Sequence, residues 1–248
     1  MNEKDRTRLD DKRRRVAALL GEAPAEVVAR FARSFDVEYA HNSTAIEGNT
    51  LSLIQTKVIL EDGLSVGGKA LREIYEVANH DRAFSYVKRA VAEGRLLDEE
   101  MLKDIHALLM ENIMVGGVYR NVEVRITGAG FRPPAPQEMF QQMRWFFADM
   151  PRQREKLNAI EWAAWTHAEF VRIHPFPDGN GRTARMLMNL QLLTEGFQPI
   201  SIAKEERLAY YEALEAYAVR GELAPFAEMV AALEEARLDE YLAAFAGA

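Results

Sequence analysis

The feature that most constrains the fold of this chain is the spacing of its apolar residues, which recur every three or four positions over most of its length. Such spacing places side chains on one face of an α-helix. Capping residues, glycines and prolines mark where the helices begin and end. The pattern predicts an all-α fold, with helices at 68–94, from Asp98, from Pro136, and at 157–173, 180–196, 204–219 and 225–245.

One short segment departs from the helical period. Residues 122–127 alternate between apolar and polar side chains, and the Gly128-Ala129-Gly130 that follows can turn the chain. The segment therefore predicts a single short β-hairpin beside the helices. The prolines of 133–136 are expected to stiffen the return.

Composition excludes several classes of protein. The 248 residues contain no Cys, which rules out a disulfide scaffold, a thiol nucleophile and an iron–sulfur centre. The net charge of −7 argues against a general nucleic-acid binder. Residues 1–15 are too charged for a signal peptide, and no apolar run is long enough to cross a membrane. We expect a cytoplasmic protein without nucleic-acid or membrane partners, whose charged N-terminus is a solvated helix or a frayed end.

The segment from His174 to Arg185 carries the most chemistry. Pro175 and Pro177 force the residues before them out of the helical region, so a loop must separate two helices here. Residues 178–181, Asp-Gly-Asn-Gly, form a turn that leads into the second helix. The backbone N–H groups at a helix N-terminus are unpaired and lie at the positive end of the dipole, which favours an anion.

The side chains of this loop point to phosphate chemistry. Arg182 and Arg185 share a face of the first helical turn, where cations oppose the helix dipole, and this suggests a compensating anion. The Asp178 carboxylate suits Mg²⁺ bound together with phosphates. His174 titrates near neutrality and can serve as a general base. A simple helix-capping turn would explain Asp178 to Asn180, but neither His174 nor the paired arginines.

The whole string, His174-Pro-Phe-Pro-Asp-Gly-Asn-Gly-Arg-Thr-Ala-Arg185, resembles the motif of the Fic family at every defined position. The resemblance extends over about residues 40–226 and implies a Fic-type helical bundle with one short β-hairpin, called the flap. In that family ATP is bound across the motif, and AMP passes to a Ser, Thr or Tyr hydroxyl of a protein.

The resemblance also implies a role for each motif residue. His174 would deprotonate the target hydroxyl, and Asp178 would hold Mg²⁺ on the phosphates. The α- and β-phosphates would be bound by Gly179, Asn180, Gly181 and Arg182, and the γ-phosphate by Arg185. Relatives that transfer a phosphate instead have Lys where this chain has Gly181, so Gly181 favours AMP transfer.

Two further segments resemble regulatory and target-binding parts of the family. Ser43 and Glu47, one helical turn apart, resemble an inhibitory motif whose Glu pairs with the second motif arginine, here Arg185. By itself, Glu47-Gly48-Asn49 also reads as a helix stop with a solvated Glu. The predicted hairpin resembles the flap, whose residues Val124, Arg125, Ile126 and Thr127 would pair with an extended segment of the target protein.

The adenine site is less well defined by the sequence. Tyr210 and Tyr211 resemble a segment that borders the adenine pocket, although helix packing explains them equally well. Relatives often carry an Asn where this chain has Ala218, which weakens the expectation of a strict preference for ATP.

We expect three parts: an N-terminal helical extension with the inhibitory motif at 1–66, a Fic domain at 67–226, and a C-terminal helix packed on the core at 227–248. The leading functional hypothesis is an autoinhibited protein AMP-transferase that uses ATP and Mg²⁺. The alternatives are removal of AMP or transfer of another nucleotide monophosphate by the same site, and a non-catalytic module that senses nucleotide. The sequence leaves the oligomeric state open, a homodimer included.

Overall fold

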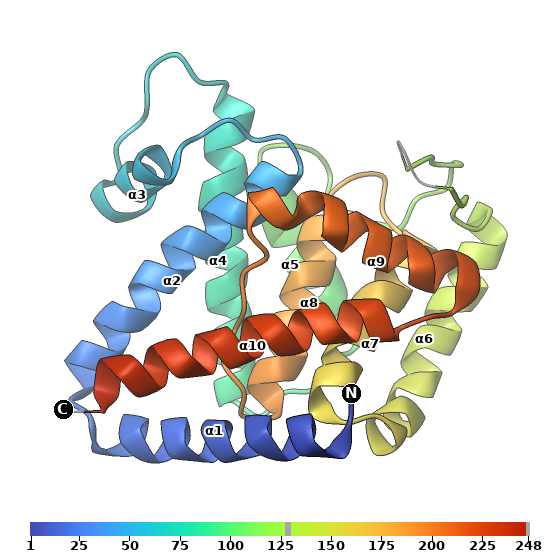
Figure 1. The fold of residues 1–248 in the computed structure, drawn as a ribbon. Helices are drawn as coiled ribbons and strands as arrows, with labels where there is room; N and C mark the ends of the chain where they lie inside the picture. Colours follow the sequence, from blue (N-terminus) through green and yellow to red (C-terminus); the bar gives the residue numbers. More distant parts are fainter. Residues whose placement is uncertain (127–129, 247–248) are drawn as a thin grey trace.

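The computed structural model describes residues 1–126 and 130–246, and within these ranges it contains ten α-helices, one 3₁₀ turn and no strand. The predicted all-α fold is confirmed. The helices, shown in Figure 1, are α1 (Glu3–Glu22), α2 (Ala25–Ile46), α3 (Leu53–Asp62), α4 (Leu71–Ala92), α5 (Glu99–Met110), α6 (Pro136–Lys156), α7 (Ala159–Ile173), α8 (Asn180–Thr194), α9 (Arg207–Arg220) and α10 (Ala224–Phe245).

Two antiparallel helices, α7 and α8, form the centre of the molecule and pack against each other more extensively than any other pair. Helix α8 is buried along nearly its whole length, and α4, α5, α7 and α2 surround it. Helix α7 begins at a capping box in which the Asn158 side chain accepts from the Glu161 N–H and the Glu161 side chain reaches back. The motif loop connects these two central helices, so the core itself fixes its position.

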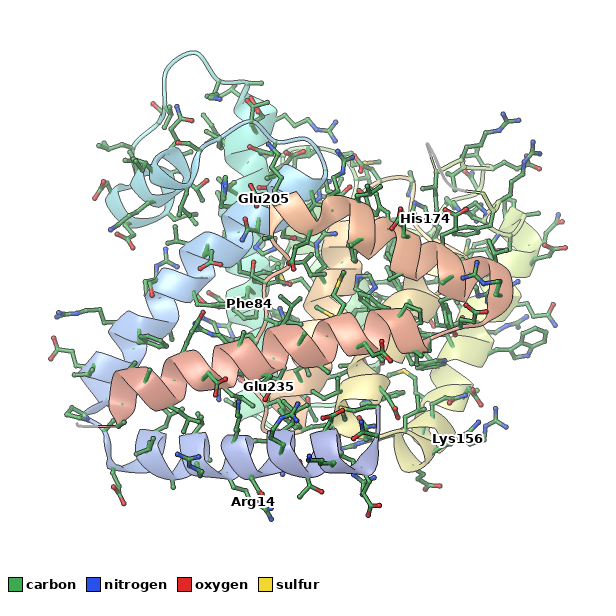
Figure 2. The ribbon with its side chains drawn as sticks, viewed as in Figure 1. Arg14, Phe84, Lys156, His174, Glu205 and Glu235 are labelled. Atoms are coloured by element: carbon green, nitrogen blue, oxygen red, sulfur yellow. The ribbon has the colours of Figure 1, made fainter. Side chains whose placement is uncertain are left out.

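The charged N-terminal segment forms a regular helix that packs on the C-terminal helix. Leu9 and Val16 lie one above the other and are buried against α10. Arg8 and Lys12 pair with Glu235, which lies between the two helices in Figure 2. The expectation of a solvated or frayed end was therefore wrong, because two apolar positions and complementary charge suffice to dock a mostly polar helix.

Helix α4 buries a more polar face than its apolar stripe predicts. Leu71, although apolar, is 68 % exposed at the helix start. The polar residues Glu76, Asn79 and His80 are buried instead, beside Val77 and Phe84. The helix itself was predicted well, but its first turns face a polar site rather than the apolar core.

The predicted hairpin is not confirmed. Residues 122–126 have no strand assignment, and Thr127, together with the turn at Gly128 and Ala129, lies outside the described residues. Val124 and Ile126 are half-buried while Arg125 is exposed, but Val122, on the same apolar side of the expected alternation, is 57 % exposed. None of the described helices is both long and apolar enough to span a bilayer.

Candidate active site

The motif loop is held in one shape by its own side chains. Helix α7 ends at Ile173, and His174 adopts a left-handed conformation with φ of 53°, which is unusual for a residue with a side chain. Phe176 is fully buried. The Asn180 side chain accepts from the Phe176 N–H at 2.9 Å and donates to its carbonyl at 2.8 Å. Because the Asn180 amide braces the loop, only its backbone N–H is left for a phosphate.

His106 on α5 supports the loop from below. Its ring stacks on Phe176 with 3.6 Å between ring centroids. The Gly117 N–H donates to Nδ1 at 2.8 Å, so the ring proton is on Nε2 and is donated to the Asp178 carbonyl at 2.9 Å. Burial lowers the pKa of His106 to about 4, which keeps the ring neutral. His106 is thus packed and hydrogen-bonded in its neutral form.

The imidazole of His174 has the orientation that a general base needs. Its Nδ1 lies 3.2 Å from the Val171 carbonyl, so Nδ1 carries the proton and Nε2 is free to accept one. Burial is the main cause that lowers the pKa of His174 to about 4, and the nearby Arg120 acts in the same direction. The ring is therefore neutral, and able to accept a proton, throughout the physiological pH range.

Arg120 ties the segment before α6 to the motif loop. This buried guanidinium donates to three backbone carbonyls: His174 at 2.8 Å, Val122 at 2.9 Å and Pro134 at 2.6 Å. Its own backbone N–H donates to the Pro175 carbonyl. Both ends of the segment predicted as a flap are thus fastened beside His174.

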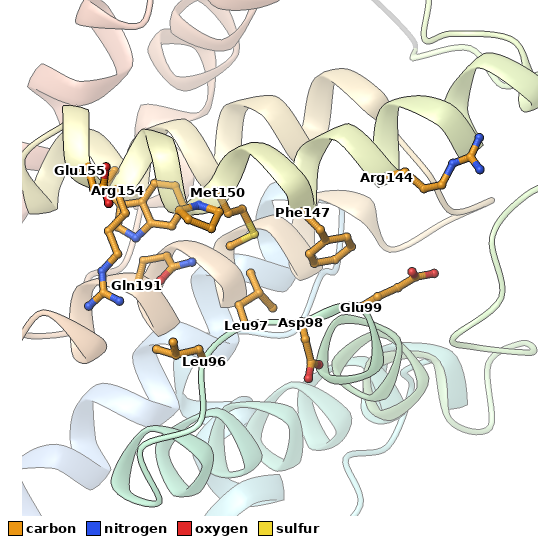
Figure 3. Close-up of a pocket in the computed structure, with 12 residues that line it drawn as sticks. Leu96, Leu97, Asp98, Glu99, Arg144, Phe147, Met150, Arg154, Glu155 and Gln191 are labelled. Carbon is orange, nitrogen blue, oxygen red and sulfur yellow. The ribbon is translucent and has the colours of Figure 1, made fainter.

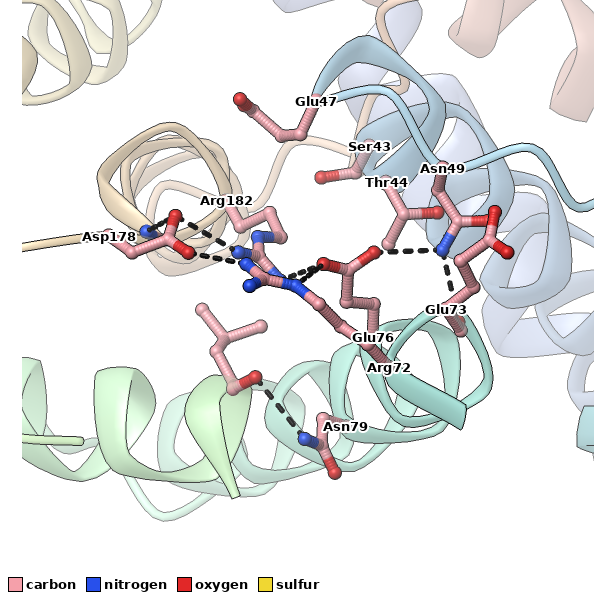
Figure 4. A network of polar contacts seen from close by, with 12 residues as sticks. Ser43, Thr44, Glu47, Asn49, Arg72, Glu73, Glu76, Asn79, Asp178 and Arg182 are labelled. Atoms are coloured by element: carbon pink, nitrogen blue, oxygen red, sulfur yellow. Dashed lines mark hydrogen bonds and ion pairs between the residues drawn. The ribbon is translucent and has the colours of Figure 1, made fainter. Parts of the chain in front are cut away.

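Asp178 belongs to a ring of alternating charges that Figure 4 shows in close-up. Its Oδ1 accepts from the Gly179 N–H at 2.6 Å, and its Oδ2 accepts from Arg72 at 2.6 Å. Arg72 also donates to Glu76, 3.1 Å away. Glu76 and Asp178 both face Arg182, at 3.6 and 3.5 Å. Burial raises the pKa of Asp178, but Arg182 and the Gly179 N–H outweigh it and hold the pKa below its ordinary value.

The guanidinium of Arg182 is buried and incompletely paired. Its Nε and Nη1 have no hydrogen-bond partner among the described residues. Burying a cation without full hydrogen bonding is costly, since the group loses its hydration. An anion with several acceptor oxygens, placed at the N-terminus of α8, would satisfy these donors.

Arg185 is buried and paired with Glu47. It donates from Nη2 to Glu47 Oε1 at 2.8 Å and to the Ser43 carbonyl at 2.7 Å, and from Nε to the Ser43 hydroxyl at 2.9 Å. Glu47 lies at the C-cap of α2, with its side chain 33 % exposed. Its Oε1 is so close to Gly181 that a Cβ there would lie 2.3 Å from it. The carboxylate therefore occupies the anion position at the first turn of α8.

The two tyrosines proposed for the adenine pocket differ in environment. Tyr210 is buried, and its hydroxyl lies 2.9 Å from His167 Nε2 and accepts from Arg185 at 3.3 Å. It acts here as a support for Arg185. Tyr211 is exposed beneath the guanidinium of Arg207. An adenine-binding role stays a prediction for both.

The site thus brings together residues from six separate stretches of the chain: α2, α4, α5, the segment with Arg120, the motif loop with α8, and α9. Sequence reasoning anticipated the motif loop and Glu47, whereas it missed the roles of Arg72, Glu76, Arg120 and His106. Only Arg120 had a local signal, since it directly precedes the predicted flap. The other three lie on ordinary amphipathic helices, and nothing in their spacing marks them.

The acidic groups fit a magnesium ion shared with a substrate. Among residues 1–126 and 130–246, no three His, Asp or Glu side chains lie close enough to hold a metal by themselves. Asp178 is a half-exposed carboxylate beside buried arginines that suit phosphates. Mg²⁺ is commonly held by one or two carboxylates together with substrate phosphates, and this donor set matches that pattern.

A large cavity of about 830 Å³ lies away from the motif loop. Figure 3 shows it between the start of α5 and the C-terminal half of α6, with Leu97, Phe147 and Met150 among the lining residues. No residue of 174–185 lines it. The cavity therefore takes no part in the site built around His174.

Comparison with known proteins places this geometry in a family. The Fic/DOC family model matches residues 96–192, which include the motif loop. A solved structure of residues 134–508 of the C. elegans protein Fic-1 aligns with 96 % of this chain and 73 % of its own, at 31 % identity and a TM-score of 0.80. This chain belongs to the Fic/DOC family. A Fic-domain signaling protein from Bacteroides thetaiotaomicron has the same fold, with a TM-score of 0.83, 26 % identity and 98 % coverage of both chains.

Curated relatives in the family are named protein adenylyltransferase Fic. The protein from Nematostella vectensis is 38 % identical over 215 residues, which cover 83 % of this chain and 48 % of the relative. The protein from Aedes aegypti is 33 % identical over 246 residues, covering 98 % and 48 % respectively. The Fic chain described here therefore spans about half the length of these relatives.

Proposed function

We propose that this Fic chain transfers AMP from ATP to a hydroxyl group of a protein, and that Glu47 restrains the reaction. The observation that carries the proposal is the motif loop. A neutral imidazole, a half-exposed carboxylate and two buried arginines converge on the N-terminus of α8. The relatives named protein adenylyltransferase Fic support the same reaction.

The proposed step is an in-line displacement at the α-phosphorus. His174 Nε2 takes the proton of the target hydroxyl, whose oxygen bonds to the α-phosphorus. The bond from that phosphorus to the α,β-bridging oxygen breaks, and pyrophosphate leaves with the electron pair. Arg182 and the N–H groups of α8 neutralise the phosphate charge. Mg²⁺, when held by Asp178, supplies further charge neutralisation on the phosphates.

The target is proposed to be a protein segment in extended conformation. The segment of residues 122–126 lies beside His174 because Arg120 fastens it there. Its backbone can pair with an extended peptide by strand addition. Such pairing would place a hydroxyl side chain near His174 with little demand on the target sequence.

Glu47 is proposed to inhibit by occupying a phosphate position. Its carboxylate pairs with Arg185 and lies against Gly181, where the resemblance to the family places the terminal phosphates. A unit-charge pair at about 4 Å with an effective dielectric constant near 20 is worth roughly 4 kcal/mol before desolvation. A hundredfold loss of rate needs only about 2.7 kcal/mol. Competition by this single carboxylate is therefore strong enough.

The decisive experiment is labelling with ATP that carries the label on its α-phosphate, in the presence of Mg²⁺. We expect Glu47→Gly to label itself or an added target at least tenfold faster than wild type. Glu47→Gln, which keeps the size of the side chain but loses its charge, should lie between the two.

The double variant Glu47→Gly with His174→Ala serves as the control and should take up no label. If Glu47→Gly is no faster than wild type, the inhibitory role is wrong. If label enters equally with and without His174, the proposed base is wrong.

Removal of AMP by the same site is the second candidate. The position of the Glu47 carboxylate against Gly181 favours it, since a carboxylate there could orient water toward a phosphate. A target labelled in advance with AMP distinguishes the two reactions. Wild type would release the label if removal is the reaction, and Glu47→Gly would not. Parallel assays with other labelled nucleotides test whether another nucleotide monophosphate is transferred.

A further inference from the structure

The oxygen atoms of Asp178 are not equivalent. Oδ1 accepts from the Gly179 N–H at 2.6 Å and faces the buried Arg182 at 3.5 Å. Among the residues that the structure describes, Oδ2 has one hydrogen-bond partner, the Arg72 guanidinium at 2.6 Å. Oδ2 is therefore the favoured oxygen for a cation, because Oδ1 already accepts from the backbone and faces a buried guanidinium. Arg72 is placed where that cation would bind.

The Arg72 side chain can move away from Asp178 and still keep its hydrogen bond to Glu76. Its side chain is 57 % exposed on the first turn of α4. Its Nη2 contacts Asp178, whereas its Nε donates to Glu76 one turn further along the helix, at 3.1 Å. If Nη2 leaves Asp178, Nε can keep its carboxylate partner and the rest of the guanidinium turns toward water. Arg182, in contrast, is buried and has no such freedom.

We propose that Arg72 is a displaceable counter-ion for the metal-binding carboxylate: it neutralises Asp178 in the resting protein and competes with Mg²⁺ for Oδ2. The inference rests on the proposed function, since it assigns Mg²⁺ to Asp178. It makes the acidic site compatible with folding in the absence of metal, because Arg72 adds to the charge neutralisation that Arg182 and the Gly179 N–H already give Asp178. It also makes the apparent metal affinity depend on a residue that does not contact the metal.

The test measures metal binding directly, in a Glu47→Gly background that removes the competing carboxylate. Mn²⁺ replaces Mg²⁺ as the probe, in the presence of a non-hydrolysable ATP analogue. Binding is read as the loss of the free Mn²⁺ electron paramagnetic resonance signal beyond the loss that the same analogue causes without protein. Adding Arg72→Ala should lower the apparent Kd for Mn²⁺ between two- and tenfold. The effect is limited because half-exposed ion pairs are weak.

A matched control is available on the same helix. Arg82 is also exposed and paired with a carboxylate, that of Glu111, but lies about 15 Å further along the axis. Arg82→Ala should leave the Kd for Mn²⁺ unchanged. Binding of the ATP analogue in the presence of a chelator gives the second readout. Here Arg72→Ala, added to an Asp178→Ala variant so that no carboxylate is left uncompensated, should change binding by less than twofold, because Arg72 is assigned no phosphate contact.

The outcomes separate this inference from the proposed function. If Arg72→Ala leaves Mn²⁺ binding unchanged or weakens it, or if Arg82→Ala tightens it equally, the counter-ion role is wrong. Weaker metal-free binding caused by Arg72→Ala even when Asp178 is already alanine would make Arg72 a phosphate ligand instead, which also overturns it. If Asp178→Ala binds Mn²⁺ as well as the background does, the assignment of the metal to Asp178 fails first, together with the step proposed for AMP transfer.

Discussion

At the scale of single residues, two buried arginines of the site, Arg120 and Arg185, donate several hydrogen bonds within the protein. Arg120 is the clearest case, since three backbone carbonyls from different segments accept from one buried guanidinium. Arg185 is held in the same manner by Ser43 and Glu47. Such residues organise backbone more than they contribute net stability, because their desolvation offsets much of the gain.

Removing Arg120 should therefore be costly. We expect Arg120→Ala to lower the free energy of unfolding by at least about 2 kcal/mol, because three backbone carbonyls lose their donor. Urea denaturation, followed by circular dichroism, measures the change. Arg125→Ala, at an exposed position in the same segment, should change stability by less than about 0.5 kcal/mol. If the two substitutions lower the free energy of unfolding equally, Arg120 does not hold this segment against the motif loop.

At the scale of elements, the helices combine predictable local signals with faces that only their neighbours explain. Helix α5 starts at Asp98, whose side chain accepts from the Met101 N–H, as its sequence predicts. Helix α10 carries two adjacent glutamates in opposite environments. Glu235 pairs with Arg8 and Lys12 on α1, whereas Glu234 is fully buried and its Oε2 has no partner among the described residues.

Glu234 should be a source of instability at neutral pH. Burial raises the pKa of Glu234 well above the ordinary value of a glutamate. At neutral pH the folded protein therefore keeps a proton on Glu234, whereas the unfolded chain has released it. Stability is therefore lost as pH rises, and Glu234→Gln, which needs no proton, should be more stable by at least about 1 kcal/mol at pH 7.5. The advantage should shrink as the pH falls toward 4.5.

Thermal or urea unfolding at several pH values checks this prediction. The neighbouring variant Glu235→Gln is the control. It loses an ion pair with Arg8 and Lys12 and should be no more stable than wild type. If Glu234→Gln is no more stable than wild type at pH 7.5, the buried carboxyl does not destabilise the fold and the prediction is wrong.

At the scale of the whole molecule, four histidines distributed over α4, α5, α7 and the motif loop are kept neutral. Burial is the main cause that lowers the pKa of His80, His106, His167 and His174. Each of these groups binds a proton more readily in the unfolded chain than in the folded one. The four histidines lie on different elements. Their contributions to the pH dependence of the free energy of unfolding therefore add.

The fold should consequently lose stability in mild acid. A histidine with a lowered pKa contributes stability that is complete above the unfolded pKa of 6.5 and is lost as pH falls toward the folded pKa. Each of the four should cost about 1.4 kcal/mol at pH 5.5 relative to neutral pH. Urea titrations between pH 7.5 and 4.5 measure this, best in Glu234→Gln, because Glu234 acts in the opposite direction. A flat profile across that window would contradict the prediction.

The sequence by itself determined the helical class, most helix boundaries and the chemistry of the motif loop. These features depend on interactions between residues four or fewer positions apart, such as caps, proline restrictions and apolar spacing. Such local patterns can be read from the sequence alone. Tertiary structure alone decided that Arg72 covers Asp178, that His106 braces the loop, and that α1 docks on α10. These contacts join residues 72 or more positions apart, and they depend on how helix faces meet, which the helical period of each segment leaves open.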